Sequence, residues 1–511
     1  MSSFVNNKRI AINTLYLYIR MLLIMFVSLY TVRVVLDSLG AEDYGLYNVV
    51  GSVVAMLAFL RGTMASASNR FFSVEMVCND IEKLRRTFSI NINIYVFITA
   101  VILAVAETAG VWYISNKLNC SPERCFAVQV IFQLSLLSFI AQLMAVTYNA
   151  LIMSHERMNV YAILSILETM IKLGVAYAIK HTTSDKLILY GSLMALTDIF
   201  LWLFYWGYCR LHFEECRYTF VWDKSKYKEI LSFTGWNFLG QIAVVLRAQG
   251  INLLINAFFN PAVNAARAIA YQVESTSIRF SENFFSAVRP QLYKAYSNHE
   301  MQPLFKLIDR STIMCTYLMS IIMLPLILNG GFVLSVWLKE VPAHTELFMA
   351  LALINGFIDC MSNGVVVSAA ATGRIKKFQL IVSGLIALNL PISYFVLRIG
   401  CSPESTVVVS IIISVLLVFV RMTLLKQNIP TFDRNAHLII VVRIMIFTLI
   451  AGGIGYIIRL IIDSSIFYLL CSSIVAILTI SIFYYAFIIG KEDRMVLMSL
   501  ITSKLKSKIN K

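Results

Sequence analysis

Apolar segments of 20 or more residues recur along the whole chain of 511 residues, separated by charges, prolines and glycines. Folded as a helix, each segment is long enough to cross a hydrocarbon core of about 30 Å. Hydrophobic residues make up 59% of the chain and charged residues 14%, whereas soluble domains are about 25% charged. The segments lack the alternation of a membrane β-barrel. The sequence therefore predicts an all-α integral membrane protein.

The breaks between the apolar segments predict fourteen membrane-spanning helices, centred near residues 23, 58, 101, 139, 169, 198, 243, 276, 320, 358, 387, 415, 449 and 477. An even number of spans places both termini on one side. That side receives 28 Lys and Arg residues and the opposite side seven, so the positive-inside rule predicts cytoplasmic termini and a multi-pass location in the cell inner membrane. This asymmetry accounts for most of the net charge of +15, and nucleic acid is not an expected partner.

The connections between spans are short, and the longest, residues 210–228, is about eighteen residues. Function is therefore expected within or across the membrane. Residues 491–511 are predicted to form a basic amphipathic helix on the anionic inner leaflet. Cys120 and Cys125 share one short loop, where they form either a small disulfide or two unpaired thiols.

Some cations lie inside predicted spans, where topology does not explain them. A charge at the bilayer centre costs several kcal/mol, so this number of cations predicts a hydrated, positively charged cavity. Guanidinium groups bind planar oxyanions, above all phosphates. The predicted substrate is therefore a phosphorylated anion. The eight cations are Arg20, Arg33, Arg61, Lys172, Arg247, Arg267, Arg279 and Arg443.

Two of these cations lie in the first and second predicted spans. Arg20 falls within about 20° of Asn13 on a helical wheel, which favours a face turned to a cavity over a structural ion pair. Arg61 lies near the centre of its span and shares a face with the small residues Ala58 and Ala65. Their size leaves room around the guanidinium. Both arginines are candidate substrate-binding residues.

The seventh predicted span carries four amides, Asn237, Gln241, Asn252 and Asn256, within an arc of about 100°. They form either a polar lane beside the substrate or hydrogen bonds between helices. Arg247 lies off this arc but is kept as a candidate.

The eighth predicted span holds two further candidates, Arg267 and Arg279, together with Glu274. Some of these charges are expected to neutralise one another, and Arg267 has an alternative role in capping the outer end of its helix. Arg279 lies nearer the middle of the span.

The other cations have simpler explanations. Lys172 follows Glu168 by one helical turn, and Arg33 precedes Asp37 by one turn near the outer surface, so both are predicted to form ion pairs. Coupling to protons or sodium is left open. The membrane-embedded acids that can carry it, or else neutralise the cations, are Glu107, Glu168, Asp198, Glu274 and Asp359.

Three stretches resemble the Wzx-type polysaccharide flippases (O-antigen or capsule repeat-unit) of the MOP superfamily. LDSLGAEDYGLYNVVGS at residues 36–52 resembles the first outer turn and second helix of that family, and SASNRFFSVEM at residues 66–76 resembles the end of that helix. FFNPAVNAARAIAYQV at residues 258–273 resembles the matching turn of the second lobe. The resemblance extends over the whole chain and contains no catalytic signature.

The resemblance implies two pseudo-symmetric six-helix lobes followed by two added helices. The implied parts are an N-terminal lobe at residues 1–215, a C-terminal lobe at 216–430, two extra helices at 431–490 and a basic cytoplasmic tail at 491–511.

The implied activity is transport. An undecaprenyl-diphosphate-linked oligosaccharide moves from the cytoplasmic to the periplasmic leaflet by alternating access, with its diphosphate held by arginines in a cationic central cavity. Lipid II flippases of the same superfamily use arginines on helices one, two and eight, and Arg20, Arg61 and Arg279 are compatible placements. The implied partners are this lipid-linked oligosaccharide and membrane lipids; no enzyme activity, cofactor or metal is implied.

Two other functions are weighed against this one. Glu42 and Asp43 superficially match the acidic residues of membrane glycosyltransferases or polymerases, but such enzymes need a sizeable outer loop to hold the acceptor. A MATE-like small-molecule exporter shares the superfamily fold, but surplus positive charge would repel cationic drugs.

Overall fold

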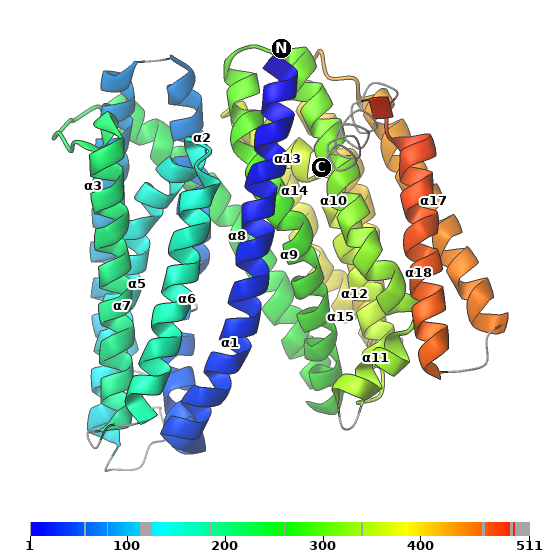
Figure 1. The fold of residues 1–511 in the computed structure, drawn as a ribbon, viewed down its shortest axis with the longest axis horizontal. Helices are drawn as coiled ribbons and strands as arrows, with labels where there is room; N and C mark the ends of the chain where they lie inside the picture. The colour runs from blue at the N-terminus through cyan, green and yellow to red at the C-terminus, as the bar shows by residue number, and fades with distance from the viewer. Residues whose placement is uncertain are drawn as a thin grey trace, which may run out of the picture. The chain divides into compact units, whose positions relative to one another are not determined.

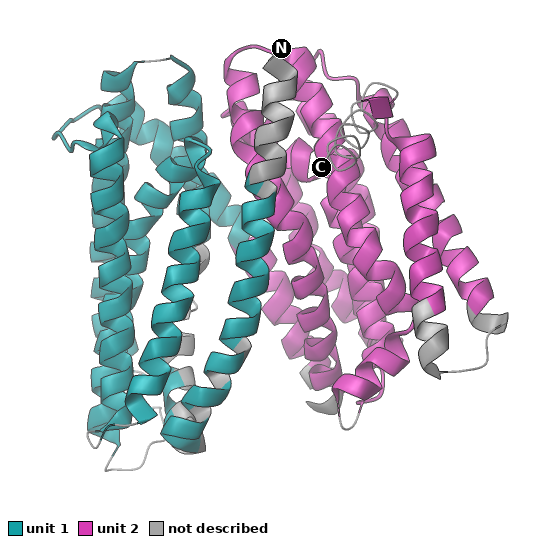
Figure 2. Cartoon of the chain, in the orientation of Figure 1, with its two compact units in different colours: residues 1–241 teal, residues 242–511 magenta. Residues whose placement is uncertain are grey.

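A computed structural model describes residues 2–55, 58–78, 80–112, 124–180, 182, 185–259, 261–338, 341–461, 465–490 and 494–495. The chain divides into two compact units, Met1–Gln241 and Ile242–Lys511, coloured separately in Figure 2. The boundary falls inside one long helix, α8 (Lys224–Phe258).

The structure is 89% helical and contains no strand among these residues. Within the same residues, 12 helices are long and apolar enough to cross a membrane. These two observations confirm the predicted all-α, multi-pass membrane fold.

Unit 1 is a bundle in which α1 packs along α6, and α5 packs against both α7 and α2 (Figure 1). The backbone turns at Gly40, which has a φ of 80° inside α1, a conformation that glycine adopts without steric cost. Phe72 and Leu151 are fully buried in one of its cores. The helices of unit 1 besides α8 are α1 (Ser2–Ala55), α2 (Ala58–Glu75), η1 (Met76–Cys78), α3 (Ile81–Val105), η2 (Ala106–Gly110), α5 (Cys125–Ser154), α6 (Met158–Lys180), α7 (Lys186–His212) and η3 (Glu214–Cys216).

Unit 2 is built around α9, which packs against α10, α12 and α13, while α16 packs against α12 and α15. Large buried side chains such as Phe285 and Phe348 fill its interior. Its helices are α9 (Pro261–Ser297), α10 (Met301–Leu328), α11 (Gly330–Trp337), α12 (Thr345–Cys360), α13 (Asn363–Ala371), α14 (Lys376–Ala387), α15 (Asn389–Arg398), α16 (Ser405–Asn428), α17 (Arg434–Ile461), α18 (Ser465–Phe483) and η4 (Tyr484–Ile488).

Aspartates cap several helices at their N-termini. Asp80 accepts a hydrogen bond from the backbone N–H of Lys83 at 3.0 Å, and Asp185 accepts one from that of Leu187 at 3.0 Å. Asp223 and Asp433 cap α8 and α17 in the same way. Each cap satisfies backbone donors that the first turn leaves unpaired.

Two predicted spans, centred near residues 58 and 276, are helical but are not among the 12 apolar helices found in the described residues. They correspond to α2, with the preceding end of α1, and to α9. Arg267, Glu274, Arg279, Glu282 and Arg289 all lie on the 37 residues of α9. The fourteen predicted centres therefore all fall on helices. The candidate site is built around α2 and α9.

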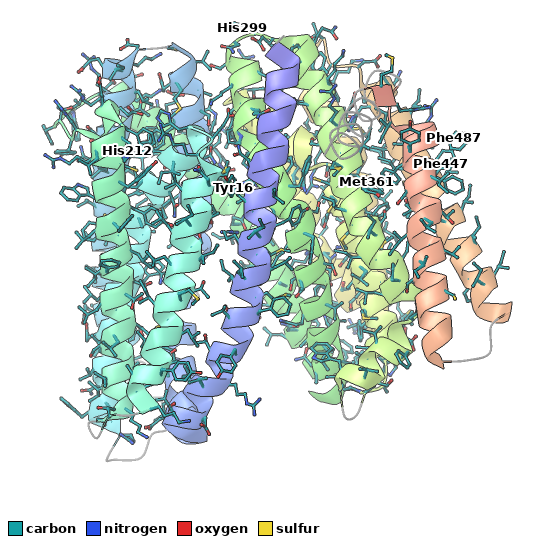
Figure 3. All side chains as sticks on the ribbon, in the orientation of Figure 1. Tyr16, His212, His299, Met361, Phe447 and Phe487 are labelled. Atoms are coloured by element: carbon teal, nitrogen blue, oxygen red, sulfur yellow. The ribbon has the colours of Figure 1, made fainter. Side chains whose placement is uncertain are left out.

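Helices α17 and α18 pack against each other, and α18 packs on α10. The hydroxyls of Tyr317 and Ser481 lie 2.9 Å apart across the α10–α18 contact. Phe447 stacks on Phe487 with ring centres 4.9 Å apart (Figure 3). Of the predicted basic tail, residues 491–511, only 494–495 lie in the described part, and Cys120 lies outside it.

Candidate functional site

Five helices of unit 1 bring polar side chains together, namely α1, α2, α5, α6 and α7. Arg61, in α2, donates a hydrogen bond to the side-chain oxygen of Gln142, in α5. Gln142 donates in turn to the carboxylate of Asp198, in α7, at 2.8 Å, and Ser138 donates to the same carboxylate oxygen. Asp198 is only 4% exposed. A chain of hydrogen bonds therefore links the Arg61 guanidinium to a buried acid.

Lys172, in α6, lies between two carboxylates of this network. Its Nζ is 2.6 Å from Oε1 of Glu168 and 3.8 Å from Oδ1 of Asp198. The pair predicted between Lys172 and Glu168 is confirmed. One ammonium group thus partly neutralises two acids inside the membrane.

Arg20, in α1, approaches the same face of α6 as Glu168, because it contacts Ser165, which lies three residues before Glu168 on that helix. Its Nη1 donates to Oγ of Ser165 at 3.4 Å, and its guanidinium carbon is 4.7 Å from the centre of the Tyr161 ring. Arginine over an aromatic face is a favourable cation–π arrangement. The unit-1 cluster comprises Arg20, Arg61, Ser138, Gln142, Glu168, Lys172 and Asp198.

Unit 2 carries a second cluster, centred on Arg267 of α9. This arginine is 5% exposed, donates a hydrogen bond to the side-chain oxygen of Asn252, and lies over the ring of Tyr271 at 4.4 Å. The prediction that Arg267 caps the outer end of its helix does not account for this burial and these partners.

Four further charged side chains complete this second cluster. Arg247 interacts electrostatically with Arg267, Glu274 and Arg421, and Asp359 interacts with Glu274. Arg421 Nη1 lies 3.9 Å from Oδ1 of Asp359. The unit-2 cluster comprises Arg247, Asn252, Arg267, Tyr271, Glu274, Asp359 and Arg421.

Arg421, Gln142 and Ser138 are members that the sequence did not single out. Arg421 was counted with the topology-determining cations, but it lies inside α16 with its side chain 14% exposed and donates to Oγ of Ser362 at 2.6 Å. The available signal for Gln142 was its spacing of four residues from Ser138 in an otherwise apolar run, which puts both on one face of α5.

Other predicted site residues lie outside the two clusters. Arg279 is exposed on α9, and Gln241 is exposed on α8. Asn237 is half-buried on the part of α8 that belongs to unit 1.

Each cluster contains one more cation than carboxylate. In unit 1 the cations are Arg20, Arg61 and Lys172, against two acids. In unit 2 three arginines face Glu274 and Asp359. A surplus of guanidinium charge at low dielectric suits a bound anion.

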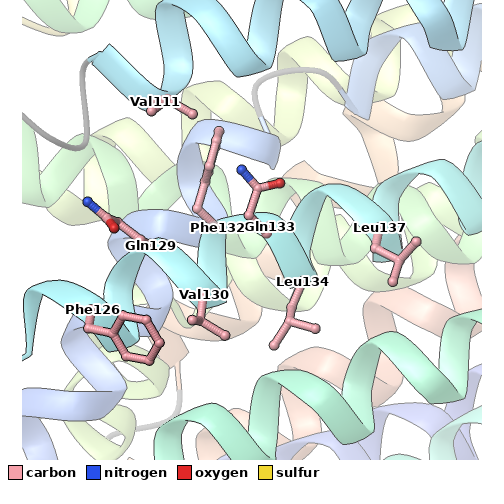
Figure 4. Close-up of a pocket in the computed structure, with 8 residues that line it drawn as sticks. All are labelled: Val111, Phe126, Gln129, Val130, Phe132, Gln133, Leu134 and Leu137. Carbon is pink, nitrogen blue, oxygen red and sulfur yellow. The ribbon is translucent and has the colours of Figure 1, made fainter.

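A hollow of ≈ 610 Å³ in unit 1 has a different chemistry. Figure 4 shows its lining, in which Phe132 and Gln133 of α5 extend toward Val111. Its lining side chains are apolar apart from Gln129 and Gln133, and no charged side chain belongs to that lining. This hollow does not suit a phosphate. Among the residues that the structure describes, no three His, Cys, Asp or Glu side chains gather as metal ligands would.

No protein-family model matches this chain, and no curated protein matches it. Solved structures do share its fold. A MATE transporter in the straight conformation superposes with a TM-score of 0.72 at 12% identity, covering 83% of this chain and 97% of that one. An outward-facing multidrug resistance MATE family transporter of the MOP superfamily gives a TM-score of 0.71 at 12% identity, covering 83% and 96%.

A third solved structure, the MATE transporter ClbM in complex with Rb⁺, gives a TM-score of 0.67 at 12% identity, covering 82% of this chain and 97% of that one. Identities this low establish the fold and leave the substrate open. This multi-pass membrane protein therefore has the fold of the MATE transporters of the MOP superfamily.

Proposed function

We propose that the protein is a flippase that moves an undecaprenyl-diphosphate-linked oligosaccharide from the cytoplasmic to the periplasmic leaflet of the inner membrane, with both termini cytoplasmic. The two six-helix lobes work by alternating access, and helices 431–490 are an addition to them. An inside-negative membrane potential favours outward movement of the anion by about 2.3 kcal/mol per charge per 100 mV.

One observation supports this proposal: neutral side chains hold two arginines of the predicted spans, the exposed Arg61 and the buried Arg267. Arg61 bonds to the amide of Gln142, and Arg267 bonds to the amide of Asn252. Within the described residues, neither guanidinium has a carboxylate within 4 Å. Keeping an unneutralised cation there costs several kcal/mol, which an anionic substrate offsets by binding to it.

The chemistry of the arginine guanidinium groups matches a diphosphate. A guanidinium offers a planar fork of donors that binds phosphate oxygens in pairs. Arg20 and Arg247 supply further positive charge in their respective clusters. We propose Arg20 and Arg61 of the unit-1 cluster as contacts of the diphosphate along its path. We propose Arg247, Arg267 and Asn252 of the unit-2 cluster as further contacts along that path. Arg279, Asn237 and Gln241 remain proposed contacts along the substrate path.

Transport is proposed in preference to glycosyl transfer, because the solved structures that share the fold are described as transporters.

A second transport function has specific support. One of those structures is a multidrug resistance transporter and another holds Rb⁺. Four membrane-embedded acids in the two clusters, Glu168, Asp198, Glu274 and Asp359, suit a MATE-like exporter or coupling to protons or sodium.

The test reconstitutes the full-length protein in liposomes with a fluorescent lipid-diphosphate sugar and measures its movement between leaflets. Arg61→Gln and Arg267→Gln each remove one cation, and both are expected to slow movement. The loss in Arg267→Gln is expected to be about 30-fold or more, because Arg267 is buried and truncating one partner of a buried charged contact costs about 2–5 kcal/mol. Arg61 is exposed, so a smaller loss is expected in Arg61→Gln. Arg86→Gln is the matched control, since Arg86 is 59% exposed and pairs with Glu82 at 3.7 Å.

Three outcomes would decide against the flippase. Glycan elongation without lipid movement would establish an enzyme. Uptake of cationic dyes with indifference to the lipid diphosphate would establish the exporter. Equal rates of lipid movement in the wild type, Arg61→Gln and Arg267→Gln would show that these arginines do not take part in transport.

A further inference from the structure

A polar groove lies between α1 and α6 of unit 1, and none of its lining residues belongs to the unit-1 cluster. Its volume is ≈ 740 Å³, within the range of about 300–1,000 Å³ of small-molecule sites. It is lined by Tyr30, Arg33, Val34 and Asp37 of α1 and by Tyr177 and Lys180 of α6.

The sequence explains why this groove is polar on one side and closed on the other. Positions 30, 33, 34 and 37 follow the helical spacing that puts side chains on one face of α1. The adjoining face carries Val35 and Leu39, which are buried against Val175, Ala176 and Ile179 of α6. This apolar contact holds the two helices together and sets the polar stripe beside the seam.

The charges of the groove do not cancel. The pair predicted between Arg33 and Asp37 is replaced by another: Asp37 lies 3.6 Å from Nζ of Lys180. Arg33 is exposed, and within the part of the chain that is described it has no carboxylate within 4 Å. The groove therefore holds two cations and one carboxylate, which pairs with Lys180, and the Arg33 guanidinium is available for a ligand.

Two tyrosines supply neutral donors and aromatic surface. The hydroxyl oxygens of Tyr30 and Tyr177 lie 2.6 Å apart in a hydrogen bond. Tyr30 is 49% exposed and Tyr177 is 41% exposed. Whichever hydroxyl accepts that bond keeps its own O–H for a ligand oxygen. The groove thus offers a guanidinium, an ammonium and a phenol to one anion.

The depth of the groove indicates where its ligand comes from. Its residues lie in the last turns of the apolar spans Leu15–Gly40 and Met158–Lys180, where lipid headgroups meet the protein. We propose that the groove binds the phosphate of a membrane lipid. The source is either a resident anionic phospholipid or the lipid-linked diphosphate, and only the second source rests on the proposed flippase function.

The experiment titrates the delipidated full-length protein in detergent with three short-chain lipids and counts bound lipid by native mass spectrometry. The probes are phosphatidylglycerol, farnesyl diphosphate and phosphatidylcholine. A lipid-facing cation near the surface contributes about fivefold in affinity. Arg33→Gln is therefore expected to weaken the saturable anionic-lipid site about fivefold, and Arg33→Gln with Lys180→Gln about 25-fold.

Controls separate this site from other sources of binding. Arg398→Gln removes an exposed arginine at the end of α15 and is expected to leave the site unchanged. Binding to the wild type is expected to weaken with added salt, a measurement that needs no variant. Tighter binding of phosphatidylglycerol would identify a resident phospholipid as the ligand, and tighter binding of farnesyl diphosphate would identify the diphosphate lipid.

The proposal is overturned if phosphatidylcholine binds this site as well as the anionic lipids do, or if the wild-type site is insensitive to salt. Equal affinity in wild type and the double variant, or an equal loss in Arg398→Gln, has the same consequence. Arg61→Gln keeps this groove intact. Loss of transport in that variant with unchanged lipid binding would uphold both proposals separately, so either can fail alone.

Discussion

The guanidinium of Arg267, in α9, donates a hydrogen bond to the side-chain oxygen of Asn252, in α8. Arg267 also lies 4.4 Å above the ring of Tyr271 and is 5% exposed. Both partners are neutral, so they satisfy the geometry of the guanidinium without cancelling its charge. A buried arginine held in this way keeps its positive charge for the anionic substrate that we propose.

Asn252→Asp tests this arrangement with an almost isosteric change. The new carboxylate keeps the acceptor for Arg267 but neutralises the guanidinium, so transport of a lipid diphosphate is expected to fall about tenfold or more while the fold is retained. The rate of lipid movement in liposomes measures the first effect and thermal unfolding in detergent the second. Asn252→Asp activity equal to that of the wild type would show that the charge of Arg267 is not used.

Lys172 provides a second test, because its ammonium separates two carboxylates. Lys172→Met leaves Glu168 and Asp198 without the cation that lies 2.6 Å and 3.8 Å from them. Removing one partner of a buried ion pair costs about 3–5 kcal/mol, so the variant is expected to unfold at a markedly lower temperature in detergent. Adding Glu168→Gln to Lys172→Met should recover much of the loss, and no recovery would contradict this account.

The fold and much of the candidate site could be predicted from the sequence, because both depend on patterns within single helices. Spans are set by the length of apolar runs, and the pair between Lys172 and Glu168 is set by the spacing of one turn. Arg33 and Asp37 have the same spacing, yet Asp37 pairs with Lys180 of a different helix. Spacing within a helix cannot show which neighbour lies closer.

Partners on different helices were beyond the sequence for the same reason. The contact between Arg61 and Gln142 depends on how α2 is rotated against α5, which side-chain packing decides. Arg421 was placed at the membrane surface because it lies near the end of an apolar run, but α16 continues to Asn428. The residue therefore sits more than one turn inside the helix, where Ser362 and Asp359 meet it.

Glu75 forms two ion pairs that are expected to contribute unequally to the stability of the protein. Its side chain is 4% exposed, and Nζ of Lys226 and Nζ of Lys83 lie 2.6 Å and 3.1 Å from its carboxylate oxygens. Lys226 is 19% exposed and Lys83 is 51% exposed. Lys226→Met is therefore expected to cost about 3 kcal/mol, and Lys83→Met about 1 kcal/mol or less. Thermal unfolding of the two variants in detergent should rank them in this order, and equal losses would contradict it.

Glu215, which lies outside the membrane spans, is expected to make the stability of the protein fall at low pH. Burial opposes its ionisation, but the hydrogen bond with His155 at 2.6 Å, a backbone hydrogen bond and the charges of His155 and Arg85 outweigh burial and lower the pKa of Glu215 below its usual 4.5. A carboxylate with a lowered folded-state pKa contributes stability that is present above the unfolded value and lost as pH falls through the folded value.

The melting temperature of the wild type should therefore fall more steeply than that of Glu215→Gln once the pH drops below about 4.5, and the difference between them should be constant above it. His155→Phe preserves a ring against Phe213, on which His155 stacks at 4.1 Å, but removes the hydrogen bond, so it should also make this fall at low pH less steep. Glu214→Gln changes an exposed neighbour and should leave the fall as in the wild type. Parallel melting curves for Glu215→Gln and the wild type down to about pH 3.5 would mean that another acid governs this transition.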